Sequence, residues 1–388
     1  MNSRRSFIRL VGGGVVMAGA AASLQGCASS SYPAIAVQPW QPADPKLEIR
    51  RWMLAHALLA PNPHNRQPWI ADLKRDGEIT LICDGDRLLP ETDPFGRQIL
   101  VGCGAFIELA VMAAAERGYS VAVDTFPGGE PSLTQLPKGA VVAKLTIRQE
   151  ASIKPDPLFA FILKRHTNKA AYDMQRPVSD ANWKLLTSAS GISNAGLTAG
   201  FVKDSATLQK MVAITRESYE IEFTTANTHL ESMRLLRIGP DEISKHRDGI
   251  SVNGLMLRTL VAAGMFDRMA VIKKGDSNYG RMMDRWQPFE TGSGYFWLAS
   301  NGNTRKQQVA AGRAYVRTHL TATSLGIDMH PLSQALQEFK EVQKPYEEMH
   351  RLLGLDPART TLQMLARVGY GVNPAEATPR RDIQTMVV

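Results

Sequence analysis

Hydrophobic residues recur along the chain with the spacing of helices in some stretches and of strands in others. Between residues 48 and 59, apolar side chains three and four positions apart predict one helical face. A similar pattern, each time ended by a glycine, predicts longer helices at residues 105–117 and 307–325. Alternation of apolar and polar residues predicts strands at 79–83 and 141–147, and a buried strand is predicted at 364–371. The chain is therefore predicted to mix helices and strands.

The loop after the first helix is kept out of helical conformation by prolines at positions 61, 63 and 68. Asn62, Asn65 and Gln67 in this loop carry amides that no predicted helix or strand uses. A rigid polar loop of this kind is typical of an edge that contacts a ligand. The alternative is a proline-stiffened turn whose amides cap neighbouring helices.

A second polar stretch, Arg165-His166-Thr167-Asn168-Lys169, sets two cations around a hydroxyl. We expect it where a new helical segment begins, so that backbone N–H groups are free as well. Charge-assisted donors, a neutral donor and free N–H groups are what a phosphate requires. A solvated basic turn is the alternative interpretation.

Near the end of the chain, Pro379-Arg380-Arg381 offers further guanidinium groups. A bidentate guanidinium is the best partner for a dianionic phosphate, so Arg380 or Arg381 fits the same role. The sequence leaves open which of the two points inward.

These stretches resemble motifs of the nitroreductase superfamily. The loop resembles its flavin-contacting Pro-Ser-x-x-Asn-x-Gln-Pro-Trp run, with Asn62 in place of the serine, and the cationic stretch resembles its Arg-x-Ser-x-Arg/Lys opening. Residues 327–333 resemble the turn near the flavin N5 atom, and residues 379–381 resemble the closing tail. The resemblance implies one FMN cofactor. It assigns FMN binding to Asn62, His64, Asn65, Gln67, Arg165, Thr167, Lys169, Leu332, Ser333, Arg380 and Arg381, with His330 as a candidate proton donor.

The order of these motifs is inverted relative to the plain family, because the loop precedes the arginine-containing opening. The resemblance therefore implies an α+β fold in which two nitroreductase-like halves, residues 46–160 and 161–388, form a pseudo-dimer within one chain. Such a chain would be a monomer with one complete flavin site. Residues 219–288 are expected to be an insertion, either a lid over the flavin or a packing excursion that buries the empty second site.

The first 26 residues are predicted to be a twin-arginine signal peptide, because Arg4-Arg5 precedes an apolar run too short to span a bilayer comfortably. The following Leu-Gln-Gly-Cys resembles a lipobox, which implies lipidation at Cys27. Residues 27–45 are predicted to be a flexible spacer. We therefore expect the export machinery and a membrane as partners, and a periplasmic lipoprotein, with the outer membrane favoured.

The other two cysteines are Cys83, in a predicted strand, and Cys103, in a predicted Gly-Cys-Gly turn. They are expected to be small buried hydrophobes, with pairing after export as the alternative. No cysteine or histidine cluster has metal-ligand spacing, so no metal site is predicted.

The net charge of +8 falls to +5 when three arginines leave with the signal peptide. No basic patch interleaved with aromatic residues accompanies it, so nucleic acid is not an expected partner. The resemblance implies an FMN oxidoreductase that reduces nitro or quinone-like small molecules. The alternative is a flavin-sequestering protein of the duplicated, Acg-type branch, in which the lid covers the flavin.

Overall fold

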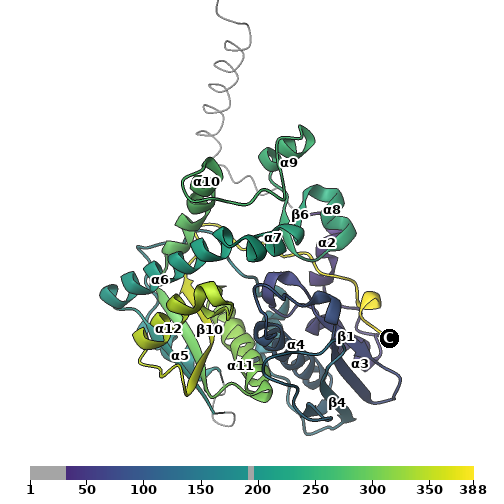
Figure 1. The fold of residues 1–388 in the computed structure, drawn as a ribbon. Helices are drawn as coiled ribbons and strands as arrows, with labels where there is room; N and C mark the ends of the chain where they lie inside the picture. Colours follow the sequence, from purple (N-terminus) through teal and green to yellow (C-terminus); the bar gives the residue numbers. More distant parts are fainter. Residues whose placement is uncertain (1–31, 191–195) are drawn as a thin grey trace, which may run out of the picture.

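The computed structural model describes residues 32–190 and 196–388, drawn in colour in Figure 1. The predicted signal peptide and the predicted lipidation site at Cys27 lie outside the described residues. Within them, helices and antiparallel sheets build an α+β protein, as the sequence predicts.

Two four-stranded antiparallel sheets repeat one topology. The first has the order β1-β2-β4-β3 and the second the order β5-β8-β10-β9. In both sheets the strands therefore lie side by side in the same spatial order: first, second, fourth and third along the chain. The first sheet comprises β1 (Trp69–Asp72), β2 (Glu78–Cys83), β3 (Tyr119–Thr125) and β4 (Val141–Gln149). The second comprises β5 (Leu197–Val202), β8 (Gly294–Asn301), β9 (Asp328–Pro331) and β10 (Thr360–Gly369).

The helices repeat in the same way. A nine-residue helix precedes each sheet, α3 (Ile49–Ala57) in the first half and α5 (Asp180–Ser188) in the second. A 20-residue helix follows the second strand of each, α4 (Arg97–Glu116) and α11 (Arg305–Ser324). This repetition is the internal pseudo-dimer that the sequence predicts.

The central helices α4 and α11 touch through their backbones. A Cβ atom added at Gly104 would lie 2.0 Å from the Val309 carbonyl oxygen, and one added at Gly312 would lie 1.9 Å from that of Val101. Only glycine allows so close an approach. The two halves are thus locked together by one glycine from each.

The start of α4 differs from the prediction. Gly102, Cys103 and Gly104 lie inside this helix, which begins at Arg97, rather than in a turn before it. The stretch is almost entirely buried, so tertiary packing outweighs the low helix propensity of glycine. Helix α4 is long and apolar enough to cross a membrane, but most of it is buried inside the protein, as in the core helix of a soluble domain.

Cys83 and Cys103 are free and buried, as predicted. The neighbouring Cys83 thiol and burial raise the pKa of Cys103, so this thiol stays protonated in the core.

The spacer prediction is wrong for residues 34–40, which fold as the short helices α2 (Ala34–Val37) and η1 (Gln38–Trp40). The Trp40 side chain is buried, and its Nε1 donates to the Thr378 carbonyl at 2.7 Å. This segment packs against the C-terminal tail, and the ordered domain therefore begins before Lys46.

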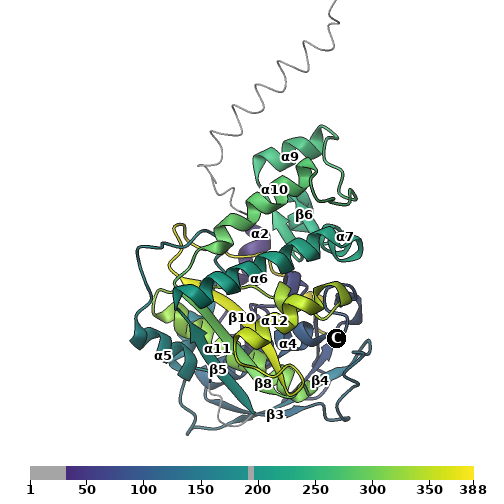
Figure 2. The ribbon, with the colours of Figure 1, turned by 60° about the vertical axis from the view of Figure 1, so that its left-hand side comes forward.

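A long insertion separates the neighbouring strands β5 and β8 and spans residues 203–293, which is wider than the predicted 219–288. It lies over one end of the two halves (Figure 2). It contains α6 (Ser205–Thr224), α7 (Ala226–Arg234), β6 (Leu236–Ile238), α8 (Gly239–His246), β7 (Ile250–Val252), α9 (Leu255–Ala262) and α10 (Ser277–Trp286).

After α12 (Gln343–Leu352) and β10, the chain crosses back to the first half. Ala71 of β1 donates to the Met386 carbonyl at 2.7 Å, and Val388 donates back to the Ala71 carbonyl at 3.1 Å. Figure 1 shows this yellow segment ending beside β1. The crossing carries Arg380 and Arg381 to the proline-rich loop.

Candidate functional site

The site is centred on two buried guanidinium groups, those of Arg165 and Arg380, which are 2% and 3% exposed. Both donate to the Leu59 carbonyl, at 2.9 and 3.2 Å, although one comes from the cationic stretch and the other from the C-terminal tail. Arg165 also contacts His319 Nδ1 at 3.3 Å. The sequence-predicted cationic stretch and tail therefore meet at the end of the first helix.

No carboxylate within the described residues neutralises either arginine. Burial lowers the pKa of Arg165 to about 10, and burial together with the nearby Arg165 charge lowers that of Arg380 to about 9. Both still carry their charge near neutral pH. Uncompensated buried charge is costly, and a dianionic phosphate is the ligand that would remove this cost.

Trp40 and His166 flank the two arginines. The Trp40 ring lies 5.8 Å from the guanidinium of Arg165 and 5.2 Å from that of Arg380, and it meets the His166 ring edge-on. Burial and the charges of Arg165 and Arg380 lower the pKa of His166 to about 4, so this ring is neutral. His166 Nδ1 and Arg380 Nε are buried without partners among the described residues.

The cationic stretch differs from its prediction, because no helix begins there. Arg165 instead caps the end of the 3₁₀ helix η4 (Pro157–Lys164). Thr167 has no hydrogen bond within the described chain. Lys169 is exposed, and its charge lowers the pKa of both His64 and His330. Lys169 therefore lies between the proline-rich loop and β9.

The proline-rich loop holds an unusual backbone conformation. His64, Asn65 and Gln67 all have positive φ, between 46° and 51°, a region that residues other than glycine rarely occupy. Asn62 braces this shape, since its Oδ1 accepts from the Gln67 N–H at 2.7 Å. Strain of this kind clusters at binding sites, where the surrounding structure holds it in place.

The loop amides bind the tail and the insertion. Asn65 Nδ2 donates to the Pro379 carbonyl, and Asn65 Oδ1 accepts from Arg380. Gln67 Oε1 accepts from the Arg381 N–H, while Gln67 Nε2 donates to the Arg247 carbonyl. As predicted, no local helix or strand uses these amides; their partners come instead from the tail and the insertion, which are distant in the sequence.

The tail resolves which arginine points inward. Arg380 enters the site, whereas the Arg381 side chain donates to the carbonyls of Gln67 and Thr385 and stays half-buried. Arg381 therefore supports the loop and the tail rather than the buried charge centre.

In the predicted flavin-facing turn, the two backbone N–H groups assigned to the flavin differ in whether they already have a partner. The Leu332 N–H is taken by the Leu365 carbonyl at 2.9 Å, whereas the Ser333 N–H has no acceptor in the described residues. His330 is buried, and its Nδ1 accepts from Arg367 at 3.0 Å. Burial and the charge of Arg367 hold the pKa of His330 well below its usual range, so the His330 ring is neutral, and its role as a proton donor remains a prediction.

Glu222 brings an acid from the insertion to the loop. Its Oε1 lies 3.9 Å from His64 Nε2, and its Oε2 accepts from Gln337 at 3.0 Å. Burial raises the pKa of Glu222 to about 7, and burial with the charges of Lys169 and Arg66 lowers that of His64 to about 4. Between these values both groups are neutral, so the contact is not an ion pair at mildly acidic pH.

The two groups give opposite pH dependences of stability. The raised Glu222 pKa contributes stability that is lost as the pH rises from about 4.5 to 7, and the lowered His64 pKa contributes stability that is lost as the pH falls from 6.5 to about 4. In urea unfolding at several pH values, Glu222→Gln should therefore gain stability over the wild type as the pH rises, whereas His64→Gln should gain as the pH falls. Difference curves that stay flat across this range would contradict the assignment.

Asp248 fastens the insertion to the first half. Its carboxylate accepts from Arg87 Nη1 at 2.7 Å and from Arg237 Nε at 3.0 Å, and it lies 3.8 Å from Arg66 Nη1. The Gly249 N–H donates to the Asn65 carbonyl in the same contact. The surrounding arginines hold the pKa of Asp248 below its usual range despite burial, so the carboxylate is ionised.

Sequence reasoning did not identify three residues that contribute to the site: Trp40, Glu222 and Asp248. For Trp40, the one signal in the sequence that could have indicated a structural role is an isolated tryptophan in a proline-rich stretch. No sequence signal distinguishes Glu222 and Asp248, because each is one acid among many in the insertion and acquires its role only through tertiary packing.

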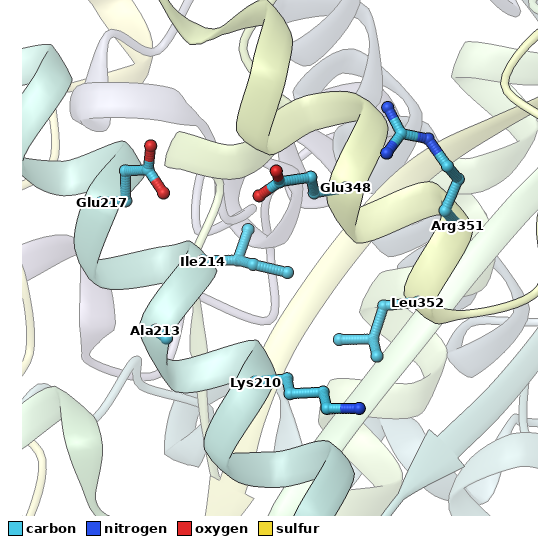
Figure 3. Close-up of a pocket in the computed structure, with 7 residues that line it drawn as sticks. All are labelled: Lys210, Ala213, Ile214, Glu217, Glu348, Arg351 and Leu352. Carbon is cyan, nitrogen blue, oxygen red and sulfur yellow. The ribbon is translucent and has the colours of Figure 1, made fainter.

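A separate surface groove of about 490 Å³ lies between α6 and α12 (Figure 3). It shares no residue with the site. Its lining residues are Lys210, Ala213, Ile214, Glu217, Glu348, Arg351 and Leu352.

No protein-family model matches this sequence. A comparison with curated proteins finds "Putative NAD(P)H nitroreductase Rv3131" of Mycobacterium tuberculosis (strain ATCC 25618 / H37Rv), 24% identical over 354 residues, which is 88% of this chain and 92% of that protein. "Putative NAD(P)H nitroreductase acg" of the same organism is 26% identical over 343 residues, 84% of this chain and 91% of that protein. This chain is therefore similar, over most of its length, to two proteins named as putative NAD(P)H nitroreductases.

Solved structures give a looser match. The FMN-dependent nitroreductase NfnB from Mycobacterium smegmatis has a TM-score of 0.37 and 13% identity, over 59% of this chain and 96% of that one. A nitroreductase with bound FMN from Desulfitobacterium hafniense has a TM-score of 0.34 and 15% identity, over 58% and 94%.

Proposed function

We propose that this protein binds one FMN between its halves and acts as an oxidoreductase of the nitroreductase type. The observation that carries the proposal is the pair of buried, uncompensated arginines, Arg165 and Arg380, beside the strained loop. Similarity to two putative nitroreductases along most of the chain supports the same conclusion.

The residues present fit an FMN phosphate. Arg165 and Arg380 would hold the dianion, and Thr167 and Lys169 lie on the same stretch to add a hydroxyl and a third cation. The Ser333 N–H, which has no acceptor among the described residues, is available to the ring system. The cofactor, when bound, supplies transfer of electron pairs, while the chain binds, orients and shields it.

The expected acceptors are nitro or quinone-like small molecules. We also propose that the protein is exported by the twin-arginine route and anchored in a membrane, with the outer membrane favoured, through lipidated Cys27. Little NAD(P)H is expected outside the cytoplasm. A quinol or a redox partner protein is therefore the expected donor, although the curated relatives are named for NAD(P)H.

An anaerobic reaction tests the activity directly. The purified protein is reduced with dithionite and then mixed with a nitroaromatic compound, while flavin absorbance near ~450 nm is followed. Reoxidation that keeps pace with acceptor reduction supports the oxidoreductase. Reduced flavin that persists in the presence of acceptor contradicts it.

A flavin-sequestering protein is the second candidate, and the contacts of the insertion favour it. Asp248 tethers the insertion to Arg66 of the loop, the Arg247 carbonyl accepts from Gln67, and the Gly249 N–H donates to the Asn65 carbonyl. A cover fastened by these contacts would keep acceptors away from a bound flavin.

Removing the Asp248 carboxylate tests this cover. Asp248→Asn leaves three arginines without their shared counter-charge and should loosen the insertion, since breaking a partly buried ion pair costs roughly 3–5 kcal/mol. Proteolysis within residues 236–252 and the rate of flavin reoxidation should both rise at least about tenfold. Asp241→Asn, an exposed acid on α8 without an ion pair in the described residues, is the matched control. A variant as protected as the control would show that the cover does not depend on Asp248.

A further inference from the structure

The far end of the insertion exposes a concentrated set of apolar side chains. Six of the thirteen large exposed hydrophobic residues of the described chain lie between residues 255 and 271. The most open are Leu255, Met256 and Met265, at 73%, 65% and 73% exposure. A concentration of exposed apolar side chains of this kind is typical of an interaction site. We call residues 255–271 the apolar tip.

The apolar side chains of α9 are exposed because the opposite face of this helix packs against the insertion. Leu257, on the opposite face of this helix, is buried against Leu236 and Ile238 of β6. That contact leaves Leu255 and Met256 facing outward. Figures 1 and 2 both show α9 at the end of the insertion farthest from the two sheets. The tip therefore projects from the molecule, and no described part of the chain covers it.

The charge around the tip suits an anionic surface. Between residues 255 and 286 the sequence has six cationic and three anionic side chains. Two of the cations, Arg268 and Lys274, pair with glutamates elsewhere in the insertion, which leaves four cations against three acids. Lys273 and Arg281 are exposed there. Basic residues beside exposed apolar side chains are the combination that binds the headgroup region of an anionic bilayer.

The start of the described chain lies at the same end of the molecule. Tyr32 donates its hydroxyl hydrogen to the Ser251 carbonyl at 3.1 Å, four residues before the tip begins at Leu255. Cys27 precedes Tyr32 by five residues, which span at most roughly 18 Å when fully extended. A lipid on Cys27, which rests on the proposed function, would thus bring the bilayer close to the tip.

We propose that the apolar tip lies against a lipid bilayer with anionic headgroups. The exposed leucine and methionine side chains enter the boundary between headgroups and acyl chains, and the basic residues contact the headgroups. One end of the insertion then faces the membrane, and the other end contacts the proline-rich loop. This arrangement would place the covered site within reach of membrane-dissolved reactants.

Site-specific photocrosslinking tests the proposal on the full chain. A benzophenone side chain replaces Met256 on α9, or Leu185 on α5, which is 48% exposed and serves as the matched control. Each protein is irradiated with vesicles of phosphatidylethanolamine that contain a minority of phosphatidylglycerol. We expect lipid adducts at position 256 and none at position 185.

Substitution of the tip gives the complementary result. On a Cys27→Ser background, which removes the proposed anchor, Leu255→Ser/Met256→Ser/Met265→Ser should weaken vesicle binding at least about tenfold, whereas Leu133→Ser/Leu185→Ser should leave it unchanged. Equal lipid adducts at both positions, no adduct at 256, or an adduct to protein instead of lipid in native membranes would overturn the proposal. The readout does not depend on flavin, so failure of the FMN site would leave these outcomes unaltered. A Cys27→Ser chain, tested in parallel, shows separately whether anchoring fails.

Discussion

Replacing Arg380 with methionine should weaken FMN binding about 10- to 100-fold, because hydrogen bonds to a charged group contribute roughly 1.5–3 kcal/mol each. The flavin-free protein should respond in the opposite sense. Its buried guanidinium has no counter-charge among the described residues, so the variant should be as stable as the wild type or more stable. Fluorescence titration with FMN and thermal unfolding of the flavin-free protein measure the two effects.

Arg381→Met provides the control for this experiment. It removes the same charge one residue later, but from a side chain that binds the Gln67 and Thr385 carbonyls. FMN affinity should therefore change little, while the tail loses stability. If both variants lost FMN equally, the phosphate site would not be where Arg165 and Arg380 meet. Arg165→Met should behave like Arg380→Met.

The substitution Gly312→Ala should be the most destabilising single change in the fold. Its methyl group would lie 1.9 Å from the Val101 carbonyl oxygen, and backbone on both sides prevents an easy adjustment. Forced separation of α4 and α11 should cost at least about 3–5 kcal/mol, which is enough to prevent accumulation of soluble protein. Soluble yield and urea unfolding measure this loss.

Gly280→Ala is the matched control for the helix crossing. Gly280 lies in α10, where an added Cβ meets nothing within 4 Å. Alanine there should be neutral or stabilising by up to about 1 kcal/mol, because it lowers the conformational freedom of the unfolded chain. Gly104→Ala should resemble Gly312→Ala. If Gly312→Ala unfolded like the Gly280 variant, the halves would not be locked at this crossing.

Local periodicity explains what could be predicted from the sequence. The helix at Ile49–Ala57, the long helix at Arg305–Ser324 and the buried strand at Thr360–Gly369 have strong patterns, and each lies within a few residues of its prediction. Among the strands of the two four-stranded sheets, β1, β3, β5, β8 and β9 were not predicted. β1 is only four residues long, and β3 is only partly buried, so neither has a full alternating pattern.

Long-range contacts explain the rest. The proximity of the loop, the cationic stretch and the tail followed from recognising their motifs together, and the structure does bring Asn65, Arg165 and Arg380 to one place. The direction in which each side chain points did not follow from the motifs. The amides of Asn65 and Gln67 are used by residues more than 170 positions away, a fact that no local pattern records. FMN binding by these residues remains a prediction.

A comparison of FMN with riboflavin tests the central claim most directly, because the two ligands differ only by the phosphate. Flavin-free protein is titrated with each, and both stoichiometry and affinity are measured. One FMN should bind per chain, and riboflavin should bind at least about 100-fold more weakly, since it offers no dianion to Arg165 and Arg380. Equal affinities for the two flavins, or no binding of FMN, would contradict the account.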